Sequence, residues 1–523
     1  MTVRLPDHLD LIAAAPAGIQ KLRGLILELA VRGKLVPQDP NDEPASELLK
    51  RIAKERARLE ASKRHQATPL GDDVQMSFEL PKTWQWVRFE EIAQHNSGKT
   101  LDKGRNSGEP RPYITTSNLY WGRFELDSVR EMLINDDELQ RCTARKNDLL
   151  ICEGGEAGRA AVWPHDYEIC FQNHVHRARL FGGINPYFAY RFFEKLNASG
   201  EIDLYRKGVG ISNMSGKALA SIPFPVPPLA EQHRIVTKVD ELMALCDRLE
   251  AEQADAGAAH ARLVATLLGT LTQSADAAEL AANWQRLAEH FDTLFTTEAS
   301  LDALKQTILQ LAVMGKLVPQ GTGDTDPGWA IKRLDKLCPE IVDCPHSTPK
   351  WTATGKLCVR TSQFRPGRLD LSASRFVSDS TFSERISRLK PKENDILYSR
   401  EGGILGVACR VPLGIELCLG QRMMLIRPGK NVSSGFLELV LNSPMITQLA
   451  REKTTGGAAP RVNVATVKAY PIPVPPIDEQ HRIVAKVDEL MALCDRLKAG
   501  LAESRVQQER LAATLIASAL QAA

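Results

Sequence analysis

The chain has 523 residues, of which 43% are hydrophobic and 25% charged, and its formal net charge is +2. These values describe an ordinary globular protein with room for three or four domains at about 100–200 residues each, and they exclude a largely disordered chain. The N-terminal segment lacks the basic-then-apolar order of a signal peptide, and no apolar run approaches the roughly 20 residues of a membrane span. We therefore expect a cytoplasmic protein without membrane contact.

Cysteine spacing and charge distribution narrow the class further. The ten cysteines form no CxxC pair, and Cys246 and Cys494 lie on the apolar side of a repeated segment, so we expect reduced core thiols, no disulfides and no zinc. Acids and bases nearly balance between Trp84 and Lys217. From Ile331 to Tyr470, by contrast, 22 Lys and Arg stand against 12 Asp and Glu. The second half is the better candidate for a polyanion-binding surface.

An internal repeat begins near the N-terminus. Residues 8–38 return as residues 290–320, at an offset of 282. The offset is 245 where TTSNLYWGRFEL (115–126) matches RTSQFRPGRLDL (360–371), so the first copy carries 37 extra residues in the charged stretch after Pro40 and the linker that follows it. NDLLICEGGEAG and NDILYSREGGILG then match, and the offset settles at 248. The chain is a tandem duplication of one unit.

Each repeated unit contains two parts with different sequence patterns. The part from about Trp84 to Pro223 mixes short apolar runs with turn signals such as SGK and EGGEAG, which is typical of a mixed α/β globule with several loops. The part after Pro228 instead has apolar residues at alternating spacings of four and three, which predicts a long helix with one apolar seam. PVPP before each such run fits a helix entrance.

The helical segment EQHRIVTKVDELMALCDRL (231–249) returns at 479–497 with only Thr237 replaced by Ala485. A single copy would be interpreted as a surface helix packed on its own domain. Two copies with the same apolar seam instead favour pairing of the two helices with each other. The predicted pairing residues are Ile235, Val239, Leu242, Cys246, Leu249, Ile483, Val487, Leu490, Cys494 and Leu497.

The doubled PxPPxxEQHRIVxKVDELMALCDRL, the two LAVxGKLVPQ segments and the two dissimilar α/β blocks resemble the specificity subunit of a Type I restriction-modification system. The resemblance covers essentially the whole chain. It implies two α/β target-recognition domains, each reading one half of a split double-stranded DNA site, separated by two long helices that pair as an antiparallel coiled coil and fix the gap.

The resemblance also implies partners. Two copies of the modification (methyltransferase) subunit would dock on the conserved regions, and restriction (motor-nuclease) subunits would join through them, for DNA methylation and defence against foreign DNA. A duplicated docking segment suits two identical partners. The docking residues expected on this basis are Glu231, Gln232, His233, Arg234, Glu479, Gln480, His481 and Arg482. For two equivalent docking faces, residues 8–38 should lie near the C-terminal helix.

The expected domains follow from the repeat and the resemblance. We place an N-terminal helical segment and charged linker at 1–75, the first recognition domain at 76–225, a central region with the first spacer helix at 226–325, the second recognition domain at 326–472 and the second spacer helix at 473–523.

No motif in the sequence indicates catalysis, cofactor binding or metal binding by this chain. HNSGKT lacks the glycine at position 93 that a phosphate loop needs, INPYF (184–188) is better read as a helix start than as a methyltransferase box, and Asp343-Cys344-Pro345-His346 does not complete a metal set. NDILYSREGG lacks a nuclease lysine and is better read as a strand and glycine turn. We expect no catalytic residue, no cofactor and no metal.

DNA contacts are predicted by residue type, because phosphates attract Lys and Arg while base edges are read by Arg, Asn, Gln, Ser and Thr. The matched TSN and TSQ triplets have a structural alternative, since they recur where the two domains should read different bases. The alternative for the whole chain is a coiled-coil scaffold without base reading. The candidates are Lys99, Lys103, Arg105, Thr116, Ser117, Asn118, Lys207 and Asn213, then Ser347, Lys350, Thr361, Ser362, Gln363, Arg365, Lys453, Thr454, Thr455 and Arg461.

Overall fold

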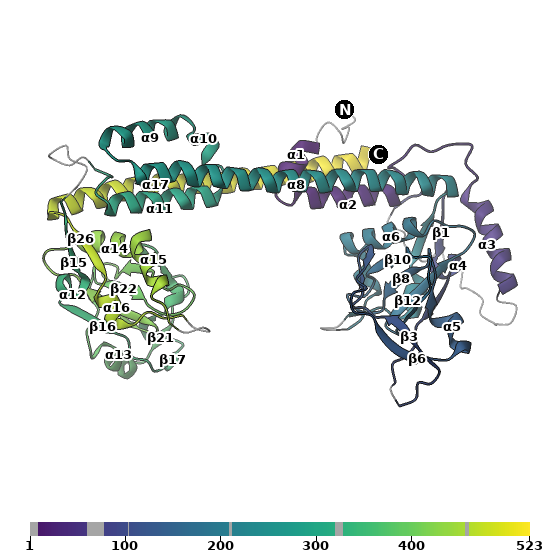
Figure 1. The fold of residues 1–523 in the computed structure, drawn as a ribbon, viewed down its shortest axis with the longest axis horizontal. Helices are drawn as coiled ribbons and strands as arrows, with labels where there is room; N and C mark the ends of the chain where they lie inside the picture. Colours follow the sequence, from purple (N-terminus) through teal and green to yellow (C-terminus); the bar gives the residue numbers. More distant parts are fainter. Residues whose placement is uncertain are drawn as a thin grey trace. The chain divides into compact units, whose positions relative to one another are not determined.

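The computed structural model describes residues 9–59, 78–102, 104–208, 212–318, 328–455 and 460–522. The chain divides into two compact units, residues 1–254 with 505–523 and residues 255–504. The division falls within two long helices, α8 (Leu229–Gln273) and α17 (Ile477–Ala522), so each long helix contributes one part to each unit. Each unit also holds one recognition domain (Figure 1).

The first recognition domain contains two four-stranded sheets, ordered β10-β8-β12-β2 and β6-β3-β11-β7, and three two-stranded ones, β1-β14, β13-β9 and β4-β5. Its strands are β1 (Gln85–Arg88), β2 (Ala93–Ser97), β3 (Glu109–Ile114), β4 (Leu119–Tyr120), β5 (Arg123–Phe124), β6 (Arg130–Ile134), β7 (Thr143–Ala144), β8 (Leu149–Cys152), β9 (Gly154–Gly155), β10 (Ala160–Val162), β11 (Ile169–Phe171), β12 (Val175–Leu180), β13 (Ser212–Asn213) and β14 (Pro223–Val226). Its helices are α4 (Phe89–Ile92), α5 (Asp136–Cys142), α6 (Pro186–Ser199), the 3₁₀ helix η2 (Glu201–Tyr205) and α7 (Gly216–Ser221).

The second recognition domain repeats this plan, with sheets ordered β16-β25-β22-β23, β17-β21-β18-β24, β15-β26 and β19-β20. Its strands are β15 (Ala330–Arg333), β16 (Glu340–Asp343), β17 (Trp351–Thr352), β18 (Lys356–Val359), β19 (Phe364–Arg365), β20 (Arg368–Leu369), β21 (Phe376–Val377), β22 (Ile396–Ser399), β23 (Ala408–Arg410), β24 (Leu417–Leu419), β25 (Met423–Arg427) and β26 (Pro471–Val474). Its helices are α12 (Leu334–Leu337), η3 (Thr361–Gln363), α13 (Asp379–Ile386), α14 (Ser434–Asn442), α15 (Pro444–Glu452) and α16 (Val464–Lys468).

The local sequence accounts for the burial of the central strands and for the pairing of the proline-containing strands. LLIC of β8 and ILYS of β22 are central in their sheets and buried along their whole length, because alternate side chains of each strand enter hydrophobic clusters on both faces of the sheet. The repeated PxPV segments instead form two-stranded pairs, β1 with β14 and β15 with β26, where a proline that donates no hydrogen bond is tolerated. These pairs close each recognition domain just before its long helix begins.

The helical part of the first unit contains α1 (Leu9–Ala14), α2 (Gly18–Val31), the start of α8 and the end of α17, and the extra residues of the first copy add α3 (Ala45–Leu59). Arg23 pairs with Glu250 at 2.8 Å and Gln38 bonds to Glu231, so α2 runs antiparallel to α8. In the second unit α11 (Glu298–Val313) takes the place of α2, next to the short helices α9 (Ala277–Glu289) and α10 (Phe291–Leu294).

The N-terminal segment lies beside the end of α17, as expected from the repeat. Lys21 pairs with Glu509 at 3.0 Å, Lys34 donates to the carbonyl of Leu520 at 3.5 Å, and α2 leucines pack on Ala519. Since α2 runs parallel to this part of α17 and antiparallel to α8, the parts of α8 and α17 in this unit are antiparallel. The expected mixed α/β repeat and antiparallel helices are confirmed.

The seam residues of the two helical copies lie in separate hydrophobic clusters. Ile235, Val239 and Cys246 are buried with α2 and with Leu515 and Ile516 of α17. Their counterparts in α17 are buried with α11 and the end of α8. Each seam therefore packs on a short helix and on the far end of the other long helix. The prediction that the two seams pack on each other is wrong, because the antiparallel helices bring each seam against the opposite end of its partner.

All ten cysteines are buried as free thiols. None of the helices in the described ranges combines the length and apolar character that crossing a bilayer requires.

Candidate nucleic-acid interface

Strand register gathers the predicted DNA-contact loops of the first recognition domain at one end. β8 and β12 are antiparallel with Cys152 opposite Val175, and β12 pairs with β2 so that His176 lies opposite Ser97. In the other four-stranded sheet β11 runs parallel to β3 with Phe171 opposite Ile114. The loops that follow Ser97, Ile114 and Cys152 therefore share one end, which we call the reading end.

The second recognition domain has the same polarity. Ser399 at the end of β22 lies opposite Met423, and β18 runs parallel to β24 with Val359 opposite Leu419. The loops that follow β16, β18 and β22 therefore meet at its reading end. Arg461 lies beside them, because its backbone forms an antiparallel β-bridge with Glu401.

The TSN and TSQ triplets build the same turn in the two domains. The Asn118 side chain accepts from the Thr115 backbone N–H at 3.0 Å and donates to the Glu125 carbonyl at 3.0 Å. Gln363 accepts from the Arg360 N–H at 2.9 Å and donates to the Asp370 carbonyl at 3.2 Å. Both amides are buried, at 4% and 3% exposure. The structural alternative therefore holds for Asn118 and Gln363, whose side chains are engaged within the turn.

The other predicted residues of the first domain differ in exposure. Lys99 is half-buried and paired with Glu138, whose pKa is lowered by that hydrogen bond. Thr116 is half-buried, and its carbonyl accepts from Arg159 at 2.6 Å. The exposed candidates are Arg105, Ser117, Lys207 and Asn213. Lys103 lies outside the described residues.

Most candidates of the second domain are exposed. Arg365 is anchored by its guanidinium to the carbonyls of Ser362 and Phe364, both at 2.9 Å, and Ser347 is held from beneath by the buried Arg385. Thr361 and Thr454 are half-buried. The exposed candidates are Ser347, Lys350, Ser362, Arg365, Lys453, Thr455 and Arg461.

Two exposed residues at the reading ends were not predicted from the sequence. His174 and Arg422 occupy equivalent positions immediately before β12 and β25, next to the glycine turns that follow β8 and β22. Arg422 has φ +65°, a left-handed conformation that is uncommon for a non-glycine residue and is often associated with functional sites. The repeat offset of 248 could have paired the two positions, but only the fold places them beside the loops.

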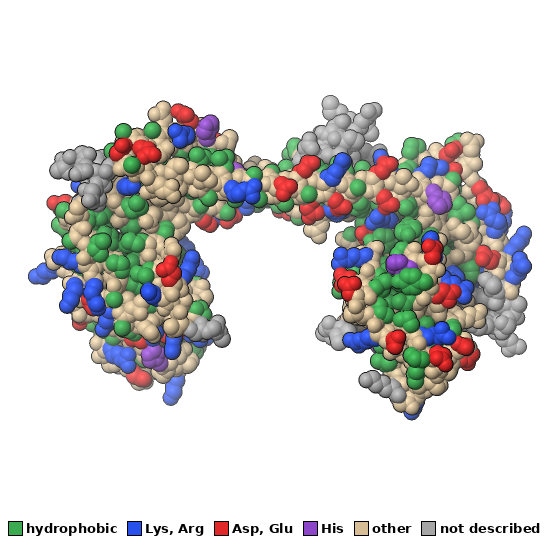
Figure 2. All heavy atoms as spheres, viewed as in Figure 1, with side chains coloured by type: hydrophobic (Ala, Val, Ile, Leu, Met, Phe, Trp, Pro, Cys, Tyr) green, Lys and Arg blue, Asp and Glu red, His purple; other side chains and the backbone are tan. Residues whose placement is uncertain are grey.

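The charge difference anticipated from the sequence is visible on the surface. In Figure 2, Lys and Arg side chains gather over the second recognition domain, whereas over the first they are interspersed with Asp and Glu. A surface richer in cations attracts phosphates more strongly.

The predicted docking segment at the start of α8 is largely engaged in the chain's own fold. Glu231 is fully buried, accepts from Trp84 Nε1 at 2.9 Å and bonds to Gln38, and burial raises the pKa of its carboxyl group. The side chain of Gln232 accepts from the Asn185 N–H at 2.8 Å. Arg234 pairs with Asp42. His233 is the exposed member of the four.

The start of α17 is similar but more open. Gln480 is fully buried and bonds to the backbone of Ser433, Asn431 and Pro475, and Glu479 is 8% exposed. His481 and Arg482 are exposed. The exposed members of the predicted docking set are therefore His233, His481 and Arg482, while the buried members fix the helix starts.

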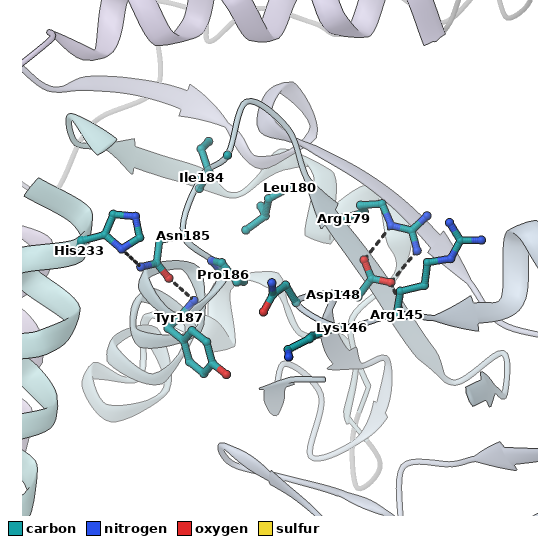
Figure 3. A pocket seen from close by; sticks show the side chains of 12 residues that line it. Arg145, Lys146, Asp148, Arg179, Leu180, Ile184, Asn185, Pro186, Tyr187 and His233 are labelled. Carbon is teal, nitrogen blue, oxygen red and sulfur yellow. Dashed lines mark hydrogen bonds and ion pairs between the residues drawn. The ribbon is translucent and has the colours of Figure 1, made fainter. Parts of the chain in front are cut away.

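A pocket of about 660 Å³ lies beside His233. Asn185 caps α6 by accepting from the Tyr187 N–H at 2.9 Å, and its amide nitrogen lies 3.1 Å from His233 Nδ1 (Figure 3). An amide donor at Nδ1 places the imidazole proton on Nε2. Arg145, Lys146 and Tyr187 also line this pocket.

The motifs set aside in the sequence have structural roles. Asn185 and Pro186 begin helix α6, as predicted. Gly98 follows strand β2 against the Phe171 backbone, where any side chain would clash. Asp343 forms a bidentate pair with Arg400 at 2.9 and 2.7 Å. Among the described residues no cluster of metal-ligating side chains occurs.

The sequence matches the family model described as Type I restriction modification DNA specificity domain over residues 81–256 and 370–504, more than half of the chain. The chain belongs to the family of Type I restriction-modification specificity subunits. It is accordingly a non-catalytic DNA-recognition subunit.

Similar proteins extend this match over nearly the whole length. The EcoAI and EcoEI specificity subunits of Type I restriction enzymes from Escherichia coli are each 33% identical, over 96% of this chain and 94% of those proteins. A solved chain from a study of complex assembly and conformational transition of the type I R-M system has a TM-score of 0.53 at 19% identity. It covers 84% of this chain and 98% of its own, which supports the fold.

Proposed function

We propose that each recognition domain of this specificity subunit reads one half of a bipartite double-stranded DNA site in the cytoplasm. The observation that carries the proposal is the repeated reading end. The two domains hold the 115–118 and 360–363 turns with the same pair of side-chain hydrogen bonds, yet present different exposed side chains around them.

Direct readout needs polar side chains that reach base edges, and positioning needs cations for phosphates. In the first domain Ser117, Asn213 and His174 supply the polar groups, with Arg105 and Lys207 as cations. The exposed residues proposed for the second domain are Ser347, Ser362, Thr455, Lys350, Arg365, Arg422, Lys453 and Arg461.

The antiparallel helices set the gap between the half-sites, and the repeated helix starts dock two modification subunits, through which restriction subunits join. The repeat of the helix start supports this part, since two equivalent segments suit two copies of one partner.

The test is co-expression with the cognate modification subunit, followed by mapping of methylated adenines across a plasmid by single-molecule sequencing. We expect methylation confined to one two-part motif with a fixed gap. A continuous motif that survives removal of either recognition domain would identify the chain as a scaffold instead.

A further inference from the structure

In each recognition domain one helix contacts the loop that follows β2 or its counterpart β16. The helices are α5 and α13, which follow the equivalent strands β6 and β21, since β6 pairs with β3 and β21 pairs with β18. We call residues 98–102 after β2 and residues 344–350 after β16 the first reading loops. They contain the candidate DNA contacts Lys99, Ser347 and Lys350. The two helices therefore lie next to the proposed reading surface.

In the second domain the contact is made by Arg385 of α13, which is only 3% exposed. Its Nη1 donates to the carbonyls of Leu419 and Gly420 at the end of β24, at 2.9 and 3.0 Å. Its Nη2 donates to the carbonyl and to the hydroxyl oxygen of Ser347, the latter at 3.3 Å. One nitrogen of the guanidinium thus holds the sheet and the other holds the loop, so Arg385 sets the position of the loop relative to the sheet.

The backbone of this loop depends on further side-chain donors. Gln421 Nε2 donates to the His346 carbonyl at 2.6 Å, and Arg388 Nη1 donates to the Asp343 carbonyl at 3.1 Å, where the loop begins. Residues 344–350 form no strand. Because side-chain donors hold the loop, the loss of one of them should shift its exposed residues without opening the sheet.

In the first domain the corresponding contact is an ion pair between Glu138 of α5 and Lys99. The helix α5 is held in turn by Arg177 of β12, a 1% exposed side chain whose Nη1 donates to the carbonyls of Gln140 and Thr143 at 3.1 and 2.7 Å. A buried arginine and a contact from the same helix to the same loop thus recur in both domains. The side chain that reaches the loop is acidic in one domain and basic in the other.

Base discrimination depends on where a side chain is held, because a recognition site must keep its groups within about 0.5 Å of the productive geometry. A residue that does not touch DNA can therefore control which base is accepted. We propose that Arg385 and Glu138 are positioning residues that set the specificity of the two half-sites by holding the first reading loops. This inference rests on the proposed function and extends it to residues that read no base themselves. Each residue affects one half-site only, since each contacts the loop of its own domain.

The test uses the full chain co-expressed with the modification subunit. Arg385→Lys keeps the positive charge, but its single nitrogen cannot serve the sheet and the loop together as two guanidinium nitrogens do. Glu138→Gln removes the charge that pairs with Lys99. It keeps a side-chain oxygen for the Asn135 N–H at the start of α5, a hydrogen bond of 3.3 Å, so the helix cap is preserved.

Two control variants lie on the same helices and do not contact the loops. Glu384→Gln changes an exposed carboxylate of α13, and Asp136→Asn changes an exposed carboxylate of α5 that pairs with Arg111 at 2.8 Å. Adenine methylation is mapped by sequencing on plasmids with the original bipartite site or with one base pair altered in either half. The measured quantity is the ratio of methylation at altered sites to methylation at the original site, for each half separately.

We expect Arg385→Lys to raise this ratio about tenfold for one half-site and Glu138→Gln to raise it by a similar factor for the other, as for the loss of one base contact. The controls should change neither ratio. Unchanged ratios in both variants, with methylation reduced in proportion at all sites, would show a purely structural role and overturn the inference. Relaxation of both half-sites by either variant would overturn it as well.

Thermal unfolding of the purified chains shows which variants fold. If Arg385→Lys does not fold, Glu138→Gln decides the question alone, because its ion pair is partly exposed and its loss is tolerated more easily. The unaltered chain separates this inference from the proposed function. If it yields no two-part methylation motif, the proposed function itself is wrong.

Discussion

Asn118 in the first recognition domain and Gln363 in the second make the same two hydrogen bonds to the backbone, although glutamine is one methylene longer. The turns around them nevertheless expose different neighbours. Two buried ion pairs repeat in the same way: Asp148 before β8 pairs with Arg179 of β12, and Asp395 before β22 pairs with Arg427 of β25. The comparison teaches that the duplicated unit keeps its buried polar framework while the exposed residues of the proposed reading loops diverge.

Removal of a buried carboxylate should have the largest effect, and it tests whether the two domains share the same buried polar framework. Asp148 is 2% exposed and accepts two hydrogen bonds from Arg179 and one from the Arg145 N–H. Asp148→Ala should lower the free energy of unfolding of the first recognition domain by about 3 kcal/mol, because a partly buried cation loses its partner. Asp395→Ala should do the same in the second domain. Differential scanning calorimetry of the full chain measures both.

Asp137→Ala is the control for this pair, since Asp137 is exposed in the first turn of α5. Its effect should stay within about 0.5 kcal/mol. A large loss for Asp148 with none for Asp395 would show that the two frameworks are not equivalent.

Next in size is the turn itself. Asn118→Ala and Gln363→Ala each leave a backbone N–H and a carbonyl without their side-chain partner, which should cost about 1–3 kcal/mol. Each should also weaken recognition of one half-site only, measured as methylation of plasmids in which single half-sites are altered. Equal damage to both half-sites by either variant would argue against independent domains.

A substitution of Arg422 should change DNA affinity without changing the stability of the domain. Arg422→Gly removes the guanidinium but suits φ +65°, so the free energy of unfolding should change by less than about 1 kcal/mol while DNA affinity of the complex falls about tenfold. Asn394→Gly is the matched control, because Asn394 has φ +62° at the far end of the same domain. Unchanged DNA binding by Arg422→Gly would remove Arg422 from the reading surface.

The smallest expected effect is a change in the salt dependence of DNA binding. Lys453→Gln should reduce the slope of log K against log salt concentration by about one unit, as for one phosphate contact, with little change in which sequences are bound. The measurement is a titration of the complex with DNA at several salt concentrations. A changed sequence preference with the same slope would make Lys453 a base-reading residue instead.

The sequence was sufficient for the large features and insufficient for the site. The repeat offsets and the four-three spacing predicted two α/β domains and two long helices, because both signals are periodic along the chain. The predicted pairing of the two seams with each other was wrong, since Ile235 and Ile483 have the same local pattern and only the fold assigns them to separate clusters. Nor could residue type show that Glu231, Gln232 and Gln480 are buried.

The reading loops illustrate the same limit. Asn118 and Gln363 have side chains suited to base reading, yet both are engaged in a turn, and the repeated triplet was the one sequence signal that favoured this alternative. Arg422 and His174 were not predicted because their position beside the glycine turns depends on strand register.

The most direct test of the account is a domain exchange in which residues 85–226 are replaced by residues 330–474. Both segments begin and end in an equivalent two-stranded sheet, so the junctions fall at matched positions. With the modification subunit present, the chimera should methylate a symmetric motif in which the second half-site appears twice as an inverted repeat. Methylation of the original, asymmetric motif would contradict independent reading by the two domains.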